Sequence, residues 1–559
     1  MKKLLTLILI LILAEVNAQN VFWAKNANGA KLDEGNGIAV DENGNTYITG
    51  HFESTTLSFG AVTCTNSTSS NYTDVFISKF DINGNCIWAK SAGGSSYEYG
   101  NAIAVDNNGN VFVTGRFEST TMNFDGTIIT NSGSRDIFIA KYDSNGVIKW
   151  AKAIGGYYDE EGLGISCDGS GNVYVTGYFD SNSLNFDSQT LTNNGGTDIF
   201  VAKFNASGSN QWAIAIGGND DERAKAIKTD NAGNTFITGF YKSPSIVFGV
   251  TTLTNSGSDA CLFVAKINSN GNSMWATSAS SINGGIMANG ISIDNSGNSY
   301  VAGTFEGTAT TIGTTTLTNI NSPNDNTFIA KFDNSGNPQW ANCAIPGPEG
   351  NEAYCIATDI SGNSYISGWF TPPSVTFGSI VLNGVGYGDN IYLVKYNNAG
   401  QVQHAYRFAG SGASGGYGNG IACDNYGNAF LTGYFEGSNM IFGNITLNNT
   451  NYNTYDVYWT KIAPGASGIE NFAQKDSTIL YPNPCFDEVI LETHFTECDR
   501  ITVTIYTMQS VIIKTIDYKC EPIGQQQILI DLNGLASGLY YLKIETEKET
   551  IIKTLVLEK

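Results

Sequence analysis

One short pattern recurs seven times along the chain and limits what the chain can fold into. Each copy reads Asp-x-x-Gly-Asn, followed by alternating bulky and small residues and a closing glycine, as in Asp106–Gly115. Glycine tolerates positive φ, and Asp and Asn side chains bond nearby backbone, so the pattern predicts a tight turn that closes a hairpin. Repetition every 62 to 65 residues predicts one supersecondary unit stacked many times. The copies begin at Asp41, Asp106, Asp168, Asp230, Asp294, Asp359 and Asp424.

Four strand signals can be aligned in each repeat. Strand one resembles Gly37–Asp41, strand two Asn45–Gly50 and strand three Asp136–Lys141, and strand four ends in Trp-Ala, as at Trp88. A longer connection between strands two and three carries a short hairpin of its own. Antiparallel four-stranded sheets with two apolar faces must be covered on both sides. A ring of such sheets is a β-propeller, which leaves only short, protected edges.

The two ends of the repeat region predict that the ring closes. The seventh repeat has no strand four after Lys461, whereas Val21–Lys25 reads as a strand four without a preceding repeat. Trp23 also precedes Trp88 by 65 residues, which matches the repeat period. We therefore expect an all-β fold: a seven-bladed β-propeller over residues 19–462, closed by the N-terminal strand.

Composition changes after the repeats. Residues 463–477 are rich in Gly, Ser and Ala and predict a linker. Residues 478–559 contain six or seven alternating segments, which predict a small immunoglobulin-like β-sandwich.

The N-terminus and the charge indicate where the protein acts. Residues 1–18 combine a basic start with a short apolar run and small residues, which is typical of a secretory signal peptide and too short for a membrane span. No other stretch reaches 18 apolar residues, so we expect no transmembrane span. A formal net charge of −22 argues against nucleic acid as a partner, because phosphate binding needs Lys and Arg.

Two resemblances follow from these motifs. The repeats resemble the bacterial β-propeller repeat family (SBBP) and, more distantly, NHL-type propellers; such folds host enzymes, lectins and scaffolds alike. The tail carries Tyr481, Pro482, Asn483 and Pro484 near its start, and Gly538 and Tyr540 in a Leu-x-x-Gly-Leu-Tyr-x-Leu-x-Ile run near its end. With these motifs it resembles the type A C-terminal sorting domain of the type IX secretion system. That resemblance implies the type IX machinery as a partner and a secreted or cell-surface location on the outer face of a Gram-negative bacterium.

The repeated aspartates and the cysteines are the residues that could bind a metal ion or form a disulfide. Calcium needs six to eight oxygens, whereas each Asp-x-x-Gly-Asn copy has one repeated Asp, so we favour turn building and predict no cofactor; calcium remains the alternative. The ten cysteines include no Cys-x-x-Cys pair, which argues against structural zinc. Cys498 and Cys520 lie symmetrically about Gln509 in a predicted hairpin, so they are a candidate disulfide.

The sequence predicts no catalytic residue. His51, His404 and His494 lie in two repeats and the tail, so no Ser-His-Asp set is evident. His404 occupies the position of the strand-four Trp, which favours a packing substitution.

The connections from strand four to the next strand one vary most, and we expect them near the channel mouth. Their tyrosines could contact sugar rings, and crowded carboxylates could bind a cation or hydroxyl groups. The candidate ligand-binding residues are Tyr97, Tyr157, Tyr158, Asp159, Glu160, Glu161, Asp220, Asp221 and Glu222. The favoured function is a secreted or surface-attached binding or scaffold module for a glycan or protein. The alternatives are a carbohydrate-active enzyme that uses loop carboxylates, a structural surface-layer component, or an acidic surface that is merely solvated.

Overall fold

The computed structural model describes residues 21–559 except for 69–70, 412–414, 450, 453, 464–478, 482–484, 496–499, 508–511, 520–523, 546–549 and 558–559. The chain divides into two compact units, residues 1–467 and 468–559, which are described separately. Every regular element in the described residues is a β-strand. Accordingly, that part of the chain contains no helix long and apolar enough to cross a membrane.

The first unit contains seven four-stranded antiparallel sheets. The inner strands are β2 (Asp33–Val40), β8 (Glu98–Val105), β14 (Glu160–Cys167), β20 (Glu222–Thr229), β27 (Ile286–Ile293), β33 (Asn351–Thr358) and β39 (Gly416–Cys423). The second strands are β3 (Thr46–Phe52), β9 (Val111–Phe117), β15 (Val173–Phe179), β21 (Thr235–Tyr241), β28 (Ser299–Phe305), β34 (Ser364–Phe370) and β40 (Ala429–Phe435). The third strands are β6 (Asp74–Phe80), β12 (Asp136–Tyr142), β18 (Asp198–Phe204), β24 (Cys261–Ile267), β31 (Asn326–Phe332), β37 (Asn390–Tyr396) and β43 (Asp456–Ile462). The outer strands are β7 (Cys86–Ala92), β13 (Ile148–Ile154), β19 (Asn210–Ile216), β25 (Ser273–Ala279), β32 (Pro338–Cys343), β38 (Val402–Phe408) and β1 (Val21–Asn26).

Short hairpins connect the second strand to the third in every sheet, as the sequence predicts. They pair β4 (Thr56–Phe59) with β5 (Val62–Thr65), β10 (Thr121–Phe124) with β11 (Thr127–Thr130), β16 (Ser183–Phe186) with β17 (Gln189–Thr192), β22 (Ser245–Phe248) with β23 (Thr251–Thr254), β29 (Ala309–Ile312) with β30 (Thr315–Thr318), β35 (Ser374–Phe377) with β36 (Ile380–Asn383), and β41 (Asn439–Phe442) with β42 (Ile445–Asn448). The two-residue strand β26 (Ser281–Ile282) adds to β29.

The repeated aspartate builds the turn between strands one and two. In the first repeat the Asp41 carboxylate accepts the backbone N–H groups of Asn43 at 3.0 Å and Asn45 at 2.9 Å. Gly44 has φ +78°, a conformation that glycine adopts without strain. The second carboxylate oxygen of Asp41 accepts the side-chain amide of Asn45 at 2.8 Å, so both oxygens of this carboxylate are engaged within the turn.

Six of the seven sheets are tied to the next by the strand-four tryptophan. The Trp88 indole N–H donates to the carbonyl of Ser144, in the turn between strands three and four of the following sheet, at 3.1 Å. A Cβ added to Gly146 in that turn would lie 2.8 Å from the Trp88 ring, so the close approach requires glycine. Trp23 in β1 makes the same bond to the carbonyl of Ile82 at 2.9 Å.

This bond accounts for His404, which replaces the tryptophan in β38. The next sheet has β43 and β1 as its last two strands, and these come from opposite ends of the repeat region. No turn joins them, so a tryptophan in β38 would find no turn carbonyl to bind. The packing interpretation of His404 agrees with this geometry.

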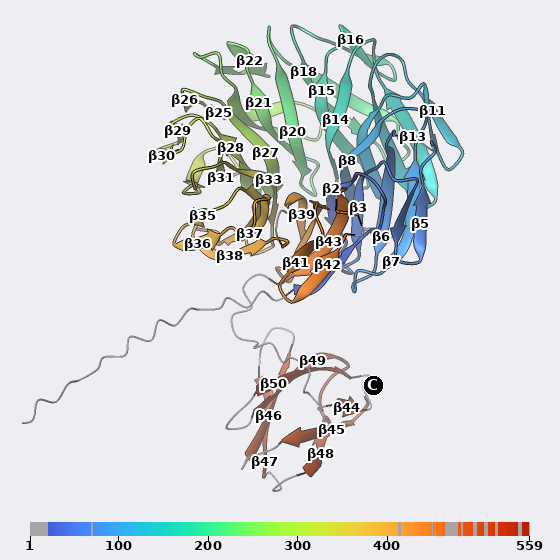
Figure 1. Cartoon of the computed structure of the whole chain (residues 1–559), viewed down its shortest axis with the longest axis vertical. Helices are drawn as coiled ribbons and strands as arrows, with labels where there is room; N and C mark the ends of the chain where they lie inside the picture. The colour runs from blue at the N-terminus through green and yellow to red at the C-terminus, as the bar shows by residue number, and fades with distance from the viewer. Residues whose placement is uncertain are drawn as a thin grey trace, which may run out of the picture. The chain divides into compact units, whose positions relative to one another are not determined.

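The first and last sheets are neighbours. β1 pairs antiparallel with β43, with Ala24 opposite Thr460, and β39 packs against β2. Figure 1 shows the sheets following one another around the unit, with β39 and β43 beside β2 and β3. The Asn419 amide donates to the Gly35 carbonyl at 3.1 Å, as the Asn36 amide does to Gly100 in the following pair of sheets at 3.0 Å.

One boundary differs from the expectation. The inner strands begin earlier than the apolar pattern indicates: in the first repeat the strand starts at Asp33 rather than at Gly37. Residues expected in the connecting loops, such as Glu160, Glu161 and Glu222, therefore lie in the strands β14 and β20.

The second unit contains two sheets that share one apolar core. One sheet has the order β44 (Ile479–Tyr481), β45 (Glu488–Phe495), β48 (Gly524–Asp531); the other has the order β47 (Ile512–Lys519), β46 (Arg500–Thr507), β49 (Gly538–Glu545), β50 (Thr550–Leu557). Val489 and Ile530 of the first sheet pack in the same core as Val503 and Leu542 of the second.

The tail motifs lie partly within the described residues. Gly538 begins β49, and the Tyr540 hydroxyl donates to the Ala536 carbonyl at 2.7 Å, so this tyrosine fastens the turn before its own strand. Tyr481 ends β44, whereas Pro482, Asn483 and Pro484 lie outside the described residues. Cys498 and Cys520 also lie outside them, so their disulfide stays a prediction, as do the signal peptide and most of the linker.

Candidate functional site

The inner strands begin at the face of the first unit that carries the strand-four-to-strand-one connections. Tyr157 and Tyr158 lie on this face, 77% and 48% exposed, with ring centroids 5.1 Å apart. Tyr97 packs between Tyr72 and Tyr99, at centroid distances of 5.0 and 6.4 Å. The predicted tyrosines therefore form two separate groups.

The predicted carboxylates have individual partners instead of crowding one another. Glu160 is fully buried, and its two oxygens accept the backbone N–H groups of Gly156 at 2.7 Å and Ser181 at 3.1 Å. Glu222 is held in the same way by Gly218 and Ser243, and burial raises the pKa of both glutamates. These two side chains fasten the connections to the sheets.

Three of the other four predicted acids are nearer to solvent. Asp159 lies 3.5 Å from Arg135, and Asp221 lies 3.5 Å from Lys242. Asp220 is exposed and accepts the backbone N–H of Asp221 at 2.8 Å. Asp159 and Asp221 thus each have a cationic neighbour, which lessens the mutual repulsion expected from the sequence.

Glu161 belongs to a cation-rich group at the start of the inner strands. Its carboxylate accepts the Asn101 amide at 2.9 Å and the Tyr178 hydroxyl at 3.1 Å, and it lies 3.6 Å from the Arg116 Nε. Arg116 also covers the Tyr99 ring at 4.5 Å. Glu161 thus joins a side-chain network that spans two neighbouring sheets.

His51 adjoins the same group. Its ring lies 4.5 Å from that of Tyr99, and its Nδ1 is 3.3 Å from the Asn36 amide. Burial, and secondarily Arg116, lower the pKa of His51 to about 3, so the ring is neutral at physiological pH. This histidine packs as a neutral polar side chain.

A run of half-buried aromatic rings occupies the opposite part of this face; we call it the aromatic cluster. The Trp369 indole N–H donates to the Tyr354 hydroxyl at 2.9 Å, and its ring lies 5.9 Å from that of Tyr417. The Tyr417 ring stacks on Tyr434 at 4.9 Å, which stacks on Tyr455 at 4.7 Å. The cluster comprises Tyr354, Trp369, Tyr417, Tyr434 and Tyr455, from the last two sheets.

Carboxyl groups border the aromatic cluster. Asp389 accepts the Tyr417 hydroxyl at 2.6 Å and the Thr371 hydroxyl at 2.8 Å, which fixes the edge of the tyrosine ring. Glu352 is hydrogen-bonded to Asp325, and burial and this neighbour raise the pKa of Glu352 to about 7. Burial likewise raises the pKa of Glu34 to about 7, and it also raises the pKa of Glu436. The cluster thus presents apolar ring faces beside hydrogen-bonding acids.

A β-bulge in every inner strand positions residues at this end. The register shifts at the fourth residue of each strand, for example between Ala353 and Cys355 in β33. A bulge adds a residue and redirects its side chain. It places Tyr354 in β33, Lys225 in β20 and Asn36 in β2 at equivalent sites, so the same backbone presents different chemistry in each repeat.

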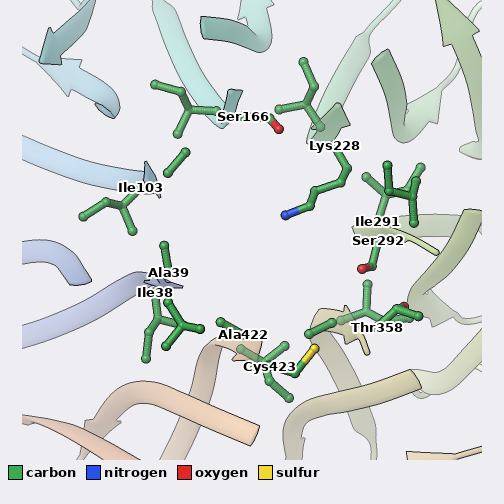
Figure 2. A pocket seen from close by; sticks show the side chains of 18 of the residues that line it. Ile38, Ala39, Ile103, Ser166, Lys228, Ile291, Ser292, Thr358, Ala422 and Cys423 are labelled. Atoms are coloured by element: carbon green, nitrogen blue, oxygen red, sulfur yellow. The ribbon is translucent and has the colours of Figure 1, made fainter. Parts of the chain in front are cut away.

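A central cavity lies further along the inner strands. It has a volume of about 330 Å³ and is lined by residues of all seven inner strands. Figure 2 shows Lys228 extending its amine into this space, among Ile38, Ile103 and Ile291 and the hydroxyls of Ser166 and Ser292.

Within the described part of the chain, no three His, Cys, Asp or Glu residues group as they would to hold a metal ion. The carboxylates of the repeated aspartates accept hydrogen bonds within their own turns. Asp106, for example, accepts the backbone N–H groups of Asn108 and Asn110 at 2.9 Å each. This geometry agrees with the interpretation that the repeated aspartates build the turns.

The comparisons with known proteins recognise both units. Residues 27–51 and 87–116 match the family model of the β-propeller repeat (SBBP), and residues 479–558 match that of the secretion system C-terminal sorting domain. The chain carries β-propeller repeats and a type IX sorting domain. Such a sorting domain implies a secreted or cell-surface protein.

Two curated proteins resemble the chain. It is 25% identical over 562 residues to an uncharacterized WD repeat-containing protein, L264, of Acanthamoeba polyphaga mimivirus, covering 82% of this chain and 40% of that protein. It is 29% identical over 147 residues to the regulatory protein FlaEY of Caulobacter vibrioides, covering 25% of this chain and 15% of that protein. The chain thus spans less than half the length of either relative.

Two solved structures match the chain at low similarity. PorZ, described as an essential surface component of the type IX secretion system of Porphyromonas gingivalis, is 11% identical with a TM-score of 0.22, covering 94% of this chain and 81% of that one. A protein of unknown function from Bacteroides thetaiotaomicron is 10% identical with a TM-score of 0.29, covering 79% of this chain and 73% of that one. Both TM-scores are low, so no conclusion about this protein rests on either structure.

Proposed function

We propose that this protein is an exported binding module. A closed, seven-bladed β-propeller carries the binding surface, and the sorting domain delivers it through the type IX machinery to the outside of a Gram-negative cell. The ligand is an extracellular glycan, bound at the aromatic cluster, with a protein ligand as the alternative. The pairing of β1 with β43 and the repeated tryptophan bond made by Trp23 support ring closure.

The aromatic cluster is the observation that carries the proposal. Five neighbouring rings stay partly exposed on the face where side chains vary between repeats. Flat apolar surfaces suit the C–H faces of sugar rings, and tyrosine and tryptophan add polar groups at their edges. The bonds from Trp369 to Tyr354 and from Tyr417 to Asp389 hold these rings in place before any ligand binds.

The bordering acids favour a neutral glycan. Asp389, Glu352 and Glu34 can accept hydrogen bonds from sugar hydroxyl groups, whereas a uronic or sialic acid would bring a further negative charge beside these acids. We therefore expect neutral polysaccharides to bind more tightly than acidic ones.

The enzyme alternative finds less support at this surface. Glycosidases place two carboxyl groups about 5–10 Å apart, on either side of the bond that is cleaved. Asp325 and Glu352 instead share a hydrogen bond with each other. A binding role fits this arrangement better.

Affinity electrophoresis and calorimetry of the full-length protein against neutral and acidic polysaccharides test the proposal. We expect saturable binding to a neutral polysaccharide, weakened at least tenfold, or about 1.4 kcal/mol, by Trp369→Ala. Tyr157→Ala is the matched control, because Tyr157 is exposed outside the cluster and should bind like the wild type. Equal loss in the control would place the site at the predicted connections, and no binding to any polysaccharide would reject the glycan proposal.

A further inference from the structure

The central cavity contains a single ammonium group that packing does not require. Lys228 lies on β20, and the equivalent positions of the other six inner strands hold only alanine or serine. These are Ala39, Ala104, Ser166, Ser292, Ala357 and Ala422. A small side chain therefore suffices for the fold at this position, and the lysine adds chemistry that the other repeats lack.

The Lys228 amine points to the middle of the cavity rather than to its wall (Figure 2). Among the described residues that line the cavity, none carries a carboxylate. Within the same part of the chain the Lys228 Nζ makes no hydrogen bond or ion pair, whereas Lys242, directly after β21, pairs with Asp221. Lys228 is the one exposed residue of β20, so its ammonium is accessible to a ligand that enters the cavity.

The other polar groups around this amine can donate hydrogen bonds. The Ser166 hydroxyl oxygen accepts the Thr229 backbone N–H at 3.0 Å, which leaves its own proton free to donate. Ser292 also lies around the cavity (Figure 2), and the Thr358 hydroxyl is buried without a hydrogen-bond partner among the described residues. Burial raises the pKa of Cys167 and Cys423 to about 12, so both lining thiols stay neutral.

Negatively charged aspartates follow the inner strands directly, in the turns to the second strands. Asp168 and Asp424 each give their carboxylate oxygens to their own turn, for example to the amides of Asn172 and Asn428. They do not line the cavity, but their charge opposes an incoming anion. Any anion bound in the cavity must therefore be held by direct contact with the ammonium and the hydroxyls.

We propose that the central cavity binds a small oxyanion on Lys228. An ammonium surrounded by hydroxyl donors matches phosphate, sulfate or a short carboxylate, which carry acceptors on all sides. A volume of about 330 Å³ suits an anion of this size with some water and is small for an oligosaccharide. This site is separate from the aromatic cluster and does not depend on the glycan proposal.

Calorimetric titration of the full-length protein with sodium phosphate, sulfate and acetate at low ionic strength tests this site. We expect saturable binding of at least one anion, reduced at least tenfold by Lys228→Met and largely retained by Lys228→Arg. Lys242→Met removes a partly exposed lysine directly after β21, outside the cavity lining, and should bind like the wild type. Thermal melting of each variant verifies that it is folded.

Three results would overturn the proposal. One is the absence of saturable binding of any of the three anions. A second is equal binding by the wild type and Lys228→Met. The third is equal loss in Lys228→Met and Lys242→Met, which would indicate general electrostatic attraction rather than a site.

Discussion

Buried carboxyl groups recur at the ends of the strands and couple the stability of the first unit to pH. Asp198 and Asp456 begin third strands, and Glu98 begins an inner strand; all three are fully or almost fully buried. Burial raises the pKa of Asp198 to about 6, of Asp456 to about 7 and of Glu98 to about 8. The folded state therefore holds these protons more tightly than the unfolded state does.

The sign of the effect follows from this difference in proton binding. The stabilisation is complete below the unfolded pKa values and is lost as pH rises through the folded values, from about pH 4 to pH 8. We predict that the melting temperature falls between pH 5.5 and pH 8.5, with Glu98 contributing most and Asp198 least, because about 1.4 kcal/mol is lost per pH unit between the unfolded and folded pKa values of each group.

Asp198→Asn is the matched variant for this prediction. Asn326 and Asn390 occupy the same position in two other repeats, so the amide fits the site. The variant should melt at a higher temperature than the wild type at pH 8.5 and show a shallower dependence on pH. A melting temperature that rises steadily over this range, or an unchanged slope in the variant, would contradict the assignment.

Single residues also show why the turns could be predicted from the sequence and the aromatic cluster could not. The turn aspartates were predictable because Asp, Gly and Asn have local conformational roles that need no tertiary contact. Trp369, Tyr417 and Tyr434 were missed because they lie inside strands. Tyr417 and Tyr434 meet across β39 and β40, and Trp369 joins them only because the preceding sheet packs alongside. The available signal was the residue after the strand-two glycine, which varies as His51, Arg116, Tyr178, Phe240, Thr304, Trp369 and Tyr434 within an otherwise regular repeat.

At the scale of the element, the N-terminal strand supplies a whole edge of the last sheet. Removing Val21–Asn26 leaves β43 without its outer neighbour and removes the bond from Trp23 to Ile82. We predict that this deletion lowers the melting temperature sharply and promotes aggregation, because an unpaired edge strand is exposed. An unchanged melting curve would contradict ring closure by β1.

Two point variants separate the tryptophan bond from general damage to this strand. Trp23→Ala should destabilise the first unit by about 3 kcal/mol, since a large ring packed on Gly84 is lost. Phe22→Ala changes a neighbouring side chain that is 59% exposed and should cost less than about 1 kcal/mol. Chemical denaturation of both variants measures the difference, and similar losses would show that Trp23 has no special part.

The boundaries of the inner strands could not be predicted because of the bulge. A strand is recognised by strict alternation of apolar and polar residues, and one inserted residue moves the alternation to the other face. In β20 the run from Glu222 to Ile227 therefore reads as an irregular polar connection, although it is a strand throughout. The hairpins and third strands have no such interruption, and their positions were predicted closely.

At the scale of the whole molecule, the chain combines a repeat unit with an export signal. The family match over residues 479–558 and the shared core of its two sheets identify the tail as a unit with its own fold. The sequence predicted this division because the repeat period ends before the tail begins. It could not supply the ligand, since the surface that could bind one forms only when separate repeats assemble.

The most direct test of the account is the location of the protein with and without its tail. Cells that carry the type IX machinery would express the full chain or a chain that ends at residue 467, and culture medium, cell surface and periplasm would be probed separately. We predict that the full chain reaches the surface or the medium, whereas the truncated chain accumulates in the periplasm, folded and resistant to protease. Finding the truncated chain outside the cell in the same amount as the full chain would contradict the account.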